Sequence, residues 1–338
     1  MATLIMAHDL GTSGNKASLF SDAGILMDSV AIPYETQYPK RGWAEQNPED
    51  WWESVCRATR KVLEGHDAAD VKAVAVSGHM MGCLPLDQHG EPLSASMIWS
   101  DGRAEEESKA LIDTLGEKAY NQITGQLASP YYPLPKIMWL RKHRPEIYER
   151  AECFLQAKDY INFKLTGALC TDITDAAYTL AYDINRHEWS DAILRAADVS
   201  AQLLPTVVPS ATVVGTITKE AATACGLKAG TPVAAGAGDG SAAHLGAASV
   251  AQGDTYICLG SSSWIMTTTD HLYFDRQGRM QSEPHVIENR YVFGGTMQTG
   301  GMSYAWAQDN LGPEPQKLQD MNARAALSAP GAGGILFL

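Results

Sequence analysis

Two short segments, far apart in the chain, combine glycine with hydroxyl side chains directly after an apolar stretch. They are Gly11, Thr12 and Ser13 near the N-terminus, and Gly260, Ser261 and Ser262 some 250 residues later. Glycine lets the backbone take positive φ and come close to a ligand. Successive backbone N–H groups in such a turn can converge on an anion. One turn of this kind is also typical of ordinary hairpins, but the pair predicts two loops that bind the phosphates of a nucleotide.

Asp9 stands at the end of the first apolar stretch, immediately before the first loop. Mg²⁺ in proteins favours one or two carboxylates together with water and phosphate oxygens. Asp9 is therefore a candidate to hold Mg²⁺ through water. The alternative is an aspartate that caps the following turn.

Asp239 lies between Gly238 and Gly240, just ahead of the second loop, where a small-residue helix is expected over 240–248. A carboxylate there can take the proton of a substrate hydroxyl during phosphoryl transfer. The positive end of a helix dipole favours an anion at the same place. Asp239 is also a second candidate for the metal, and the alternative is a simple Asp-Gly turn.

Two further segments carry side chains that could hold a small polar substrate. They contribute His79, Met80 and Met81 after an expected strand over 71–78, and Trp99, Asp101 and Arg103 after one over 96–99. Arginine can orient a polyol or a carboxylate with fork-like hydrogen bonds. The alternatives are methionines that fill the core, a buried tryptophan, and an Asp–Arg salt bridge at a helix start.

The elements around these residues predict an α/β fold with the site at the carboxyl ends of strands. Strands are expected over 3–10, 15–21, 25–35 and 71–78, and helices over 48–64, 103–115, 135–142 and 157–165. Later come strands 213–217 and 232–235 around a helix at 219–224. Strand, hydroxyl-rich turn and strand recur at 254–268. The repeat predicts two related domains, 1–248 and 249–338, facing each other across a cleft.

Composition narrows the class of protein. The 338 residues are 45% apolar and 19% charged, with a net charge of −13, which argues against a nucleic-acid partner because that would need a basic face. No apolar run approaches the ~20 residues of a membrane-spanning helix, so no membrane partner is expected. The six cysteines are scattered, and we expect buried thiols in a reducing cytoplasm.

Seven ordered segments together resemble the FGGY carbohydrate kinases, and among them the xylulokinases most. They are residues 9–14, 42–46, 51–52, 78–82, 98–103, 171–177 and 236–239. The resemblance implies an actin-like, ribonuclease-H-like fold with two domains flanking a cleft. It implies that ATP and Mg²⁺ serve to phosphorylate a sugar hydroxyl, such as that of the pentulose D-xylulose, giving the 5-phosphate. Many such kinases are dimers, so a homodimer is one expectation.

The same resemblance assigns roles to residues. It makes Asp239 the general base, places Asp9 near the metal and the γ-phosphate, and gives 11–13 and 260–262 the two phosphate loops. Met80 and Met81 match the pair of positions that touch the sugar. Xylulokinases typically carry Met-His at that pair, whereas here the second position is Met81 and a histidine stands at 79.

These departures leave the acceptor open. Gly240 also stands where the family often has a polar residue, so ribulose, glycerol, erythritol or gluconate are alternatives to D-xylulose. Family members are longer, and 335–338 reads as the start of a buried strand, so we expect a C-terminally truncated chain with an incomplete second domain. A non-catalytic sugar-binding fragment, or an ATPase of the actin or heat-shock type, are the remaining alternatives.

Overall fold

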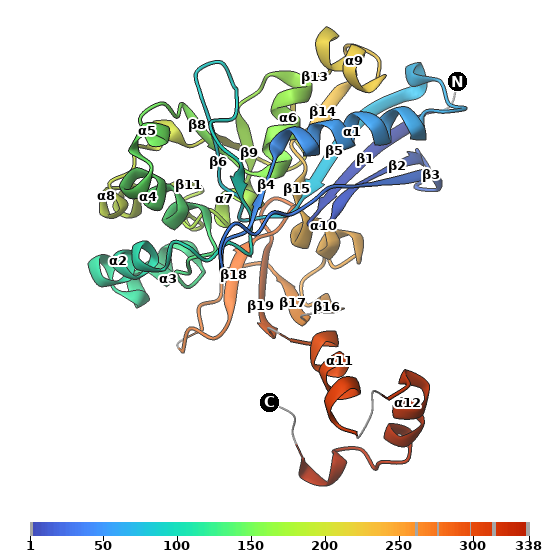
Figure 1. Cartoon of the computed structure of the whole chain (residues 1–338), viewed down its shortest axis with the longest axis vertical. Helices are drawn as coiled ribbons and strands as arrows, with labels where there is room; N and C mark the ends of the chain where they lie inside the picture. Colours follow the sequence, from blue (N-terminus) through green and yellow to red (C-terminus); the bar gives the residue numbers. More distant parts are fainter. Residues whose placement is uncertain (1–2, 261–262, 276, 298, 313–315, 336–338) are drawn as a thin grey trace.

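The computed structural model describes residues 3–260, 263–275, 277–297, 299–312 and 316–335. Its main sheet has the strand order β13-β14-β5-β1-β2-β3, with β15 also paired to β5 (Figure 1). The strands are β1 (Leu4–Gly11), β2 (Gly14–Ser21), β3 (Leu26–Pro33), β5 (Val71–Gly78), β13 (Val213–Thr216), β14 (Pro232–Ala234) and β15 (Ala237–Gly238). The antiparallel meander expected at the N-terminus is confirmed, because β1 pairs with β2 and β2 with β3.

The centre of this sheet is parallel, and that fixes where the site lies. β5 runs parallel to both β1 and β15, with Asp9 opposite Ser77 and Ala237 opposite Ser77 on the other side. Carboxyl ends of parallel strands meet at one edge of a sheet. The first loop, the segment after β5 and Asp239 therefore all leave the sheet at the same edge.

Helices pack on the sheet and bury the first core. They are α1 (Pro48–Val62), α6 (Ala157–Thr166) and α9 (Lys219–Cys225), while α10 (Asp239–Gly246) begins at the sheet edge. The side chain of Asn47 accepts from the Glu49 amide as an N-cap, as the Asn-Pro signal predicts. Trp51, Val55 and Val62 form a fully buried stripe of α1.

The other helices and short strand pairs of this part pack mainly around a second core, whose members include Leu111, Tyr120 and Leu134. The helices are α2 (Glu105–Leu115), α3 (Glu117–Thr124), α4 (Pro133–His143), α5 (Pro145–Tyr148), α7 (Ile173–Ala177) and α8 (Asp191–Ala197). The pairs are β4 (Glu45–Gln46) with β7 (Ser96–Met97), β6 (Leu84–Leu86) with β8 (Cys153–Leu155), β9 (Cys170–Asp172) with β12 (Thr206–Val208), and β10 (Tyr182–Asp183) with β11 (Glu188–Trp189). α7 and β10 contribute to a smaller third core, and Leu84 and Leu155 join the first. The expected helices over 103–115, 135–142 and 157–165 are confirmed.

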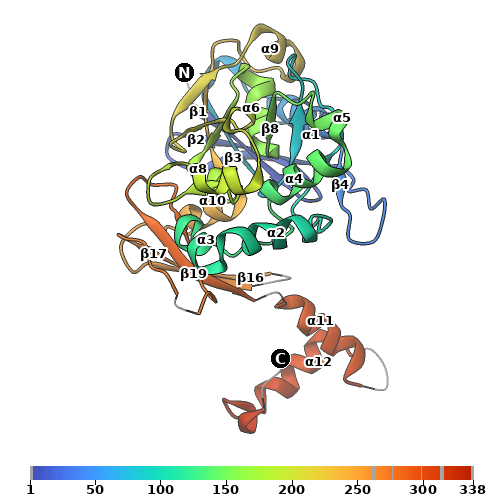
Figure 2. The same ribbon diagram turned by 90° about the vertical axis from the view of Figure 1, so that its left-hand side faces the viewer.

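The C-terminal part forms a separate antiparallel sheet of order β16-β17-β19-β18. Its strands are β16 (Thr255–Leu259), β17 (Ser263–Thr269), β18 (Gln281–Pro284) and β19 (Tyr291–Met297), followed by α11 (Gly301–Asn310) and α12 (Leu318–Ala326). The β16–β17 hairpin repeats the arrangement of β1 and β2. Figures 1 and 2 show α11 and α12 extending away from the rest of the molecule.

Two expectations outside the site have clear outcomes. The buried strand expected over 335–338 is wrong at Ile335, which is exposed and outside any strand, and the last three residues lie outside the described part of the chain. Burial of the cysteines is confirmed for all except Cys258, which is half-buried, and each of the six is a free thiol. Within the described residues, the helices are too short or too polar to cross a membrane.

Candidate active site

Asp239 is the first residue of α10 and follows β15 directly. Its side chain is half-buried, and its Oδ1 accepts a hydrogen bond of 2.7 Å from the Gly240 amide. Burial, and next to it the charge of Asp9, raise the pKa of Asp239 to about 6. Asp9 and Asp239, from distant parts of the sequence, therefore lie at the same edge of the sheet, close enough for the charge of one carboxylate to act on the other.

Asp9 is exposed at the end of β1, and the Ser77 hydroxyl donates to its Oδ1 over 3.2 Å. Two neighbouring carboxylates, one of them with a raised pKa, form a locally anionic site that a cation would neutralise. In the described parts of the chain, no three His, Cys, Asp or Glu side chains gather as a metal cage. One or two carboxylates open to solvent suit hydrated Mg²⁺, which keeps several waters and binds phosphate oxygens.

The first loop is the turn of the β1–β2 hairpin, and three side chains hold its backbone and its hydroxyl. The Tyr34 hydroxyl donates to the Gly11 carbonyl over 2.5 Å, and the Gln46 amide donates to the Thr12 carbonyl over 2.7 Å. The Trp99 indole N–H donates to Thr12 Oγ1 over 2.9 Å. These bonds fix the shape of the loop before any ligand arrives.

The second loop follows β16, and only part of it is described. The Gly260 carbonyl accepts from the Gly301 amide at the start of α11 over 2.7 Å. Ser261 and Ser262 lie outside the described residues, so their predicted phosphate contacts stay predictions.

The segment after β5 brings Met80 against the turn that carries Asp239. Met80 is buried, and a Cβ added to Gly238 would lie 2.5 Å from its Sδ, while one added to Gly240 would lie 3.9 Å from it. The small residues on either side of Asp239 thus make room for a methionine side chain. This contact is consistent with the predicted place of Met80 beside a substrate.

His79 lies inside the protein, behind this turn. Its ring is 2% exposed, packs edge-on against Trp51 with ring centres 5.4 Å apart, and neither ring nitrogen has a hydrogen-bond partner. Burial, and then the charge of Lys136, lower the pKa of His79 to about 4, so the ring is neutral. Its predicted contact with substrate stays a prediction.

Met81 has a left-handed backbone with φ of +64°, and side chains hold it on both sides. Its amide donates to Gln156 Oε1 over 2.5 Å, and its carbonyl accepts from Lys136 Nζ over 2.9 Å. Lys136 Nζ also donates to the Ile98 carbonyl over 2.7 Å. This lysine therefore ties the segment after β5 to the segment that carries Trp99.

Asp101 and Arg103 are bound to each other rather than pointing freely outward. Arg103 donates to both carboxylate oxygens of Asp101, over 2.8 Å and 2.6 Å, and to Glu45 over 2.6 Å. Its guanidinium lies 3.6 Å from the ring centre of Trp43, and Asp101 is fully buried. The Asp–Arg salt bridge weighed as an alternative is present, although buried. Trp99, at 43% exposure, is the most open of the three predicted side chains.

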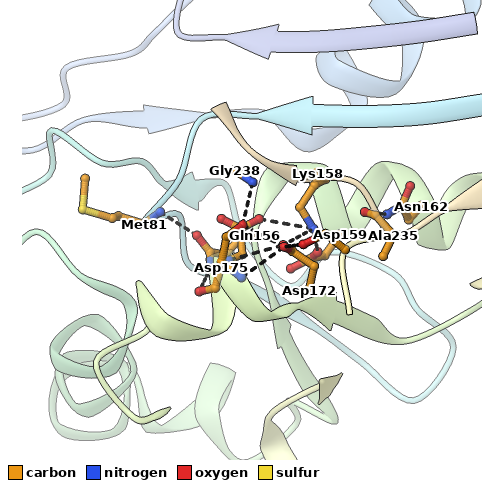
Figure 3. A network of polar contacts seen from close by, with 11 residues as sticks. Met81, Gln156, Lys158, Asp159, Asn162, Asp172, Asp175, Ala235 and Gly238 are labelled. Carbon is orange, nitrogen blue, oxygen red and sulfur yellow. Dashed lines mark hydrogen bonds and ion pairs between the residues drawn. The ribbon is translucent and has the colours of Figure 1, made fainter. Parts of the chain in front are cut away.

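A buried charge cluster below the Asp239 turn was not among the candidate site residues. Lys158 Nζ lies 2.5 Å from Asp159, 3.2 Å from Asp172 and 3.3 Å from Asp175, and all four side chains are buried (Figure 3). Burial raises the pKa of Asp175 well above its usual range. At Lys158 burial acts in the opposite direction, but the charges of the three carboxylates together outweigh it and hold the pKa of the lysine well above its own usual range. The sign of this cluster in the sequence is that four charged residues stand within stretches whose other residues the structure mostly buries.

This chain is similar in sequence and in structure to known proteins. Residues 4–246 match the model of the FGGY family of carbohydrate kinases, N-terminal domain. The xylulose kinase of Escherichia coli (strain K12) is 31% identical over 299 residues, which are 88% of this chain and 61% of that protein. A ligand-bound xylulose kinase from Lactobacillus acidophilus has a TM-score of 0.93 at 26% identity, covering 99% of this chain and 68% of its own.

A gluconate kinase from Lactobacillus acidophilus is equally similar in structure. Its TM-score is 0.94 at 25% identity, and the match covers 100% of this chain and 68% of that one. These likenesses confirm the expected α/β fold of the actin-like ATPase type. The chain spans 61% of the length of the Escherichia coli relative and about two thirds of both solved chains.

Proposed function

Because the chain belongs to the FGGY family of carbohydrate kinases, we propose that it acts in the transfer of the γ-phosphoryl group of ATP to a sugar hydroxyl. The observation that carries the proposal is the meeting of Asp239 and Asp9 at one edge of the sheet, next to the Gly11 loop. A base, a metal-binding carboxylate and a phosphate loop are the parts that phosphoryl transfer requires.

Asp239 accepts the proton of the attacking hydroxyl as the oxygen–phosphorus bond forms and the bond to the leaving ADP breaks. With a pKa of about 6, this carboxylate is ionised at neutral pH yet more basic than an ordinary aspartate. A base works best when its pKa lies near the operating pH. Its half-buried position next to Met80 allows a substrate hydroxyl to approach while most water is displaced.

Asp9 holds hydrated Mg²⁺ through water in this proposal, and Asp239 is a second contact for it. When bound, the ion neutralises the charge of the phosphate oxygens. In this proposal Thr12 and the backbone of 11–13 bind the phosphates, and 260–262 are the second predicted phosphate loop. The two loops belong to the proposed domains 1–248 and 249–338, so that closure of the cleft brings them together.

For the acceptor we propose a pentulose such as D-xylulose, phosphorylated at the 5-hydroxyl. The names of the relatives from Escherichia coli and Lactobacillus acidophilus support this substrate. An aldonate such as gluconate is the second candidate, favoured by the gluconate kinase of equal structural similarity. Because the reaction consumes ATP and the cysteines are free thiols, we infer a cytoplasmic location.

The test is ADP release by purified protein of verified intact mass, with D-xylulose, D-ribulose, glycerol, erythritol and D-gluconate as acceptors. Asp239→Asn is expected to lower turnover by about a hundredfold or more, in the range of a lost general base. The matched control is Asp191→Asn, because Asp191 is the first residue of α8, as Asp239 is of α10, but its side chain is exposed.

Each outcome decides between the candidates. ADP release that depends on one acceptor and on Asp239 supports the sugar kinase and names its substrate. ADP release that needs no acceptor would instead favour an ATPase in which the nucleotide drives a change of shape. Full turnover in Asp239→Asn contradicts the proposed base.

A further inference from the structure

Residues 172–175 connect the buried Lys158 cluster to the turn that carries Asp239 (Figure 3). Asp172 is the N-cap of α7, and its Oδ2 accepts from the Thr174 amide over 3.0 Å and from the Thr174 hydroxyl over 2.7 Å. The Ser210 hydroxyl donates to the same oxygen over 2.6 Å. The other oxygen lies 3.2 Å from Lys158 Nζ, so the Asp172 carboxylate has a fixed orientation.

Thr174 connects the fixed Asp172 carboxylate to the turn that carries Asp239. Its hydroxyl donates its one proton to Asp172, so a lone pair faces the Gly238 amide, which donates to Thr174 Oγ1 over 3.0 Å. Gly238 is the N-cap of α10 and directly precedes Asp239. Because Thr174 is 1% exposed, water cannot readily replace its hydroxyl as the partner of that amide.

The same short helix also holds the other side of the site. Gln156 donates to the Asp175 carbonyl over 2.7 Å and accepts from the Met81 amide over 2.5 Å. α7 thus has one hydrogen-bonded connection to the turn of Asp239 and one to the segment of Met81. Thr174 and Gln156 are both buried, and each side chain bonds to two groups at once, so each connection is a defined support.

We propose that Thr174 is a positioning residue, which orients the Asp239 carboxylate by fixing the Gly238 amide, with the Lys158–Asp172 pair holding its hydroxyl in place. The inference rests on the proposed function, because it assigns a task to Asp239. It also gives a physical role to the stretch 171–177, which the sequence marked without explaining. Thr174 itself does not touch the reacting atoms and acts through the backbone of the turn.

The test compares Thr174→Val with Thr174→Ser and with a matched control, Thr179→Val. Valine has the shape of threonine without the hydroxyl, and serine restores the hydroxyl. Thr179 is also buried and also makes two bonds, donating to the Ala176 carbonyl over 2.7 Å and accepting from the Ala181 amide over 3.1 Å. Its bonds stay within its own turn, so its loss reports the purely structural cost.

Two readouts separate positioning from stability. Thr174→Val is expected to lower kcat by about ten- to a hundredfold with sugar affinity changed by less than about threefold, because an unpaired buried amide and a misplaced base cost that much. Thr174→Ser is expected to keep kcat within about threefold, and Thr179→Val within about twofold. Hydrogen exchange of the amides in 237–240, followed by mass spectrometry, is expected to speed up by about tenfold in Thr174→Val only.

Hydrogen exchange is measured without turnover, so the proposed function and the proposed role of Thr174 can be refuted independently of each other. If the wild-type protein phosphorylates no sugar but exchange in 237–240 rises in Thr174→Val, the proposed function fails and the hydroxyl link to Gly238 stands. Equal exchange in wild type and Thr174→Val overturns the inference, and so does a loss of kcat no greater than that of Thr179→Val.

Discussion

Replacing the proposed base is expected to make the folded protein more stable, and the size of the gain follows from its pKa. Asp239→Asn keeps the shape of the side chain and leaves an oxygen that can accept from the Gly240 amide, as the carboxylate does over 2.7 Å. In the wild type, burial and then the charge of Asp9 raise the pKa of Asp239 from 3.8 to about 6. One unit of pKa corresponds to about 1.4 kcal/mol.

The sign follows from proton binding. The folded protein holds the Asp239 proton more tightly than the unfolded chain, so the free energy of unfolding falls as the pH rises from about 4 to about 6. At neutral pH the ionised carboxylate costs the folded state up to about 3 kcal/mol. The amide that replaces it in Asp239→Asn cannot ionise, so the variant is expected to be more stable at pH 7.5 by up to this amount. The advantage is expected to halve by about pH 5 and to disappear below about pH 4.

The assay is urea unfolding of both proteins across this pH range, with a chelator present so that no cation neutralises the pair. Asp191→Asn, which removes a carboxylate at the equivalent position of α8, is the control and is expected to show no such pattern. A free energy difference that is zero at pH 7.5, or that does not change with pH, would refute the conclusion that Asp239 is held in an unfavourable environment for its charge.

Three further substitutions test other parts of the site. Trp99→Phe removes the donor to Thr12 Oγ1 and is expected to raise the KM for ATP by about three- to tenfold with little change in Tm; an unchanged KM would contradict a role for this bond in shaping the loop. Gly236→Ala places a Cβ against the Val76 carbonyl oxygen at a φ of +76°, so urea unfolding is expected to show a loss of about 2 kcal/mol or more. Burial lowers the pKa of Lys136 to about 7, so the folded state binds fewer protons than the unfolded chain and the wild type is expected to gain stability between about pH 7 and pH 10. Lys136→Met should lack this gain, and equal slopes in the two proteins would show that the lysine is not buried as described.

The parts of the fold that depend on local signals were predictable from the sequence. The Asn47-Pro48 pair marks the start of α1, and the apolar run over 4–7 marks β1. The meeting of Asp9 and Asp239 was predictable for a different reason. Both follow apolar strands, and in an α/β sheet the carboxyl ends of parallel strands lie at one edge, so their approach needs only the correct topology.

The supporting residues were not predictable, because their partners lie far away in the sequence. Lys136 reads as an ordinary charged residue of α4, yet it is fully buried and bonds to carbonyls 38 and 55 positions away. Arg103 and Asp101 suggested a substrate contact or a surface salt bridge, whereas Glu45 and Trp43 enclose the pair. Residue type alone does not show whether a charge finds its partner inside the protein or in a ligand.

The two buried lysines show how the same side chain serves the site in two ways. Lys136 donates to carbonyl oxygens, and burial lowers its pKa to about 7. Lys158 is buried as well, but it meets three carboxylates, whose charges outweigh burial and hold its pKa well above the usual range. A shift of this kind reflects the balance between lost hydration and nearby opposite charge. Lys136, which bonds to the Met81 and Ile98 carbonyls, therefore changes its charge near neutral pH. Lys158, which lies in the cluster that supports the Asp239 turn, stays ionised. A rise in pH from about 6 to about 9 should accordingly alter the segments of Met81 and Ile98 before it alters the turn that carries Asp239.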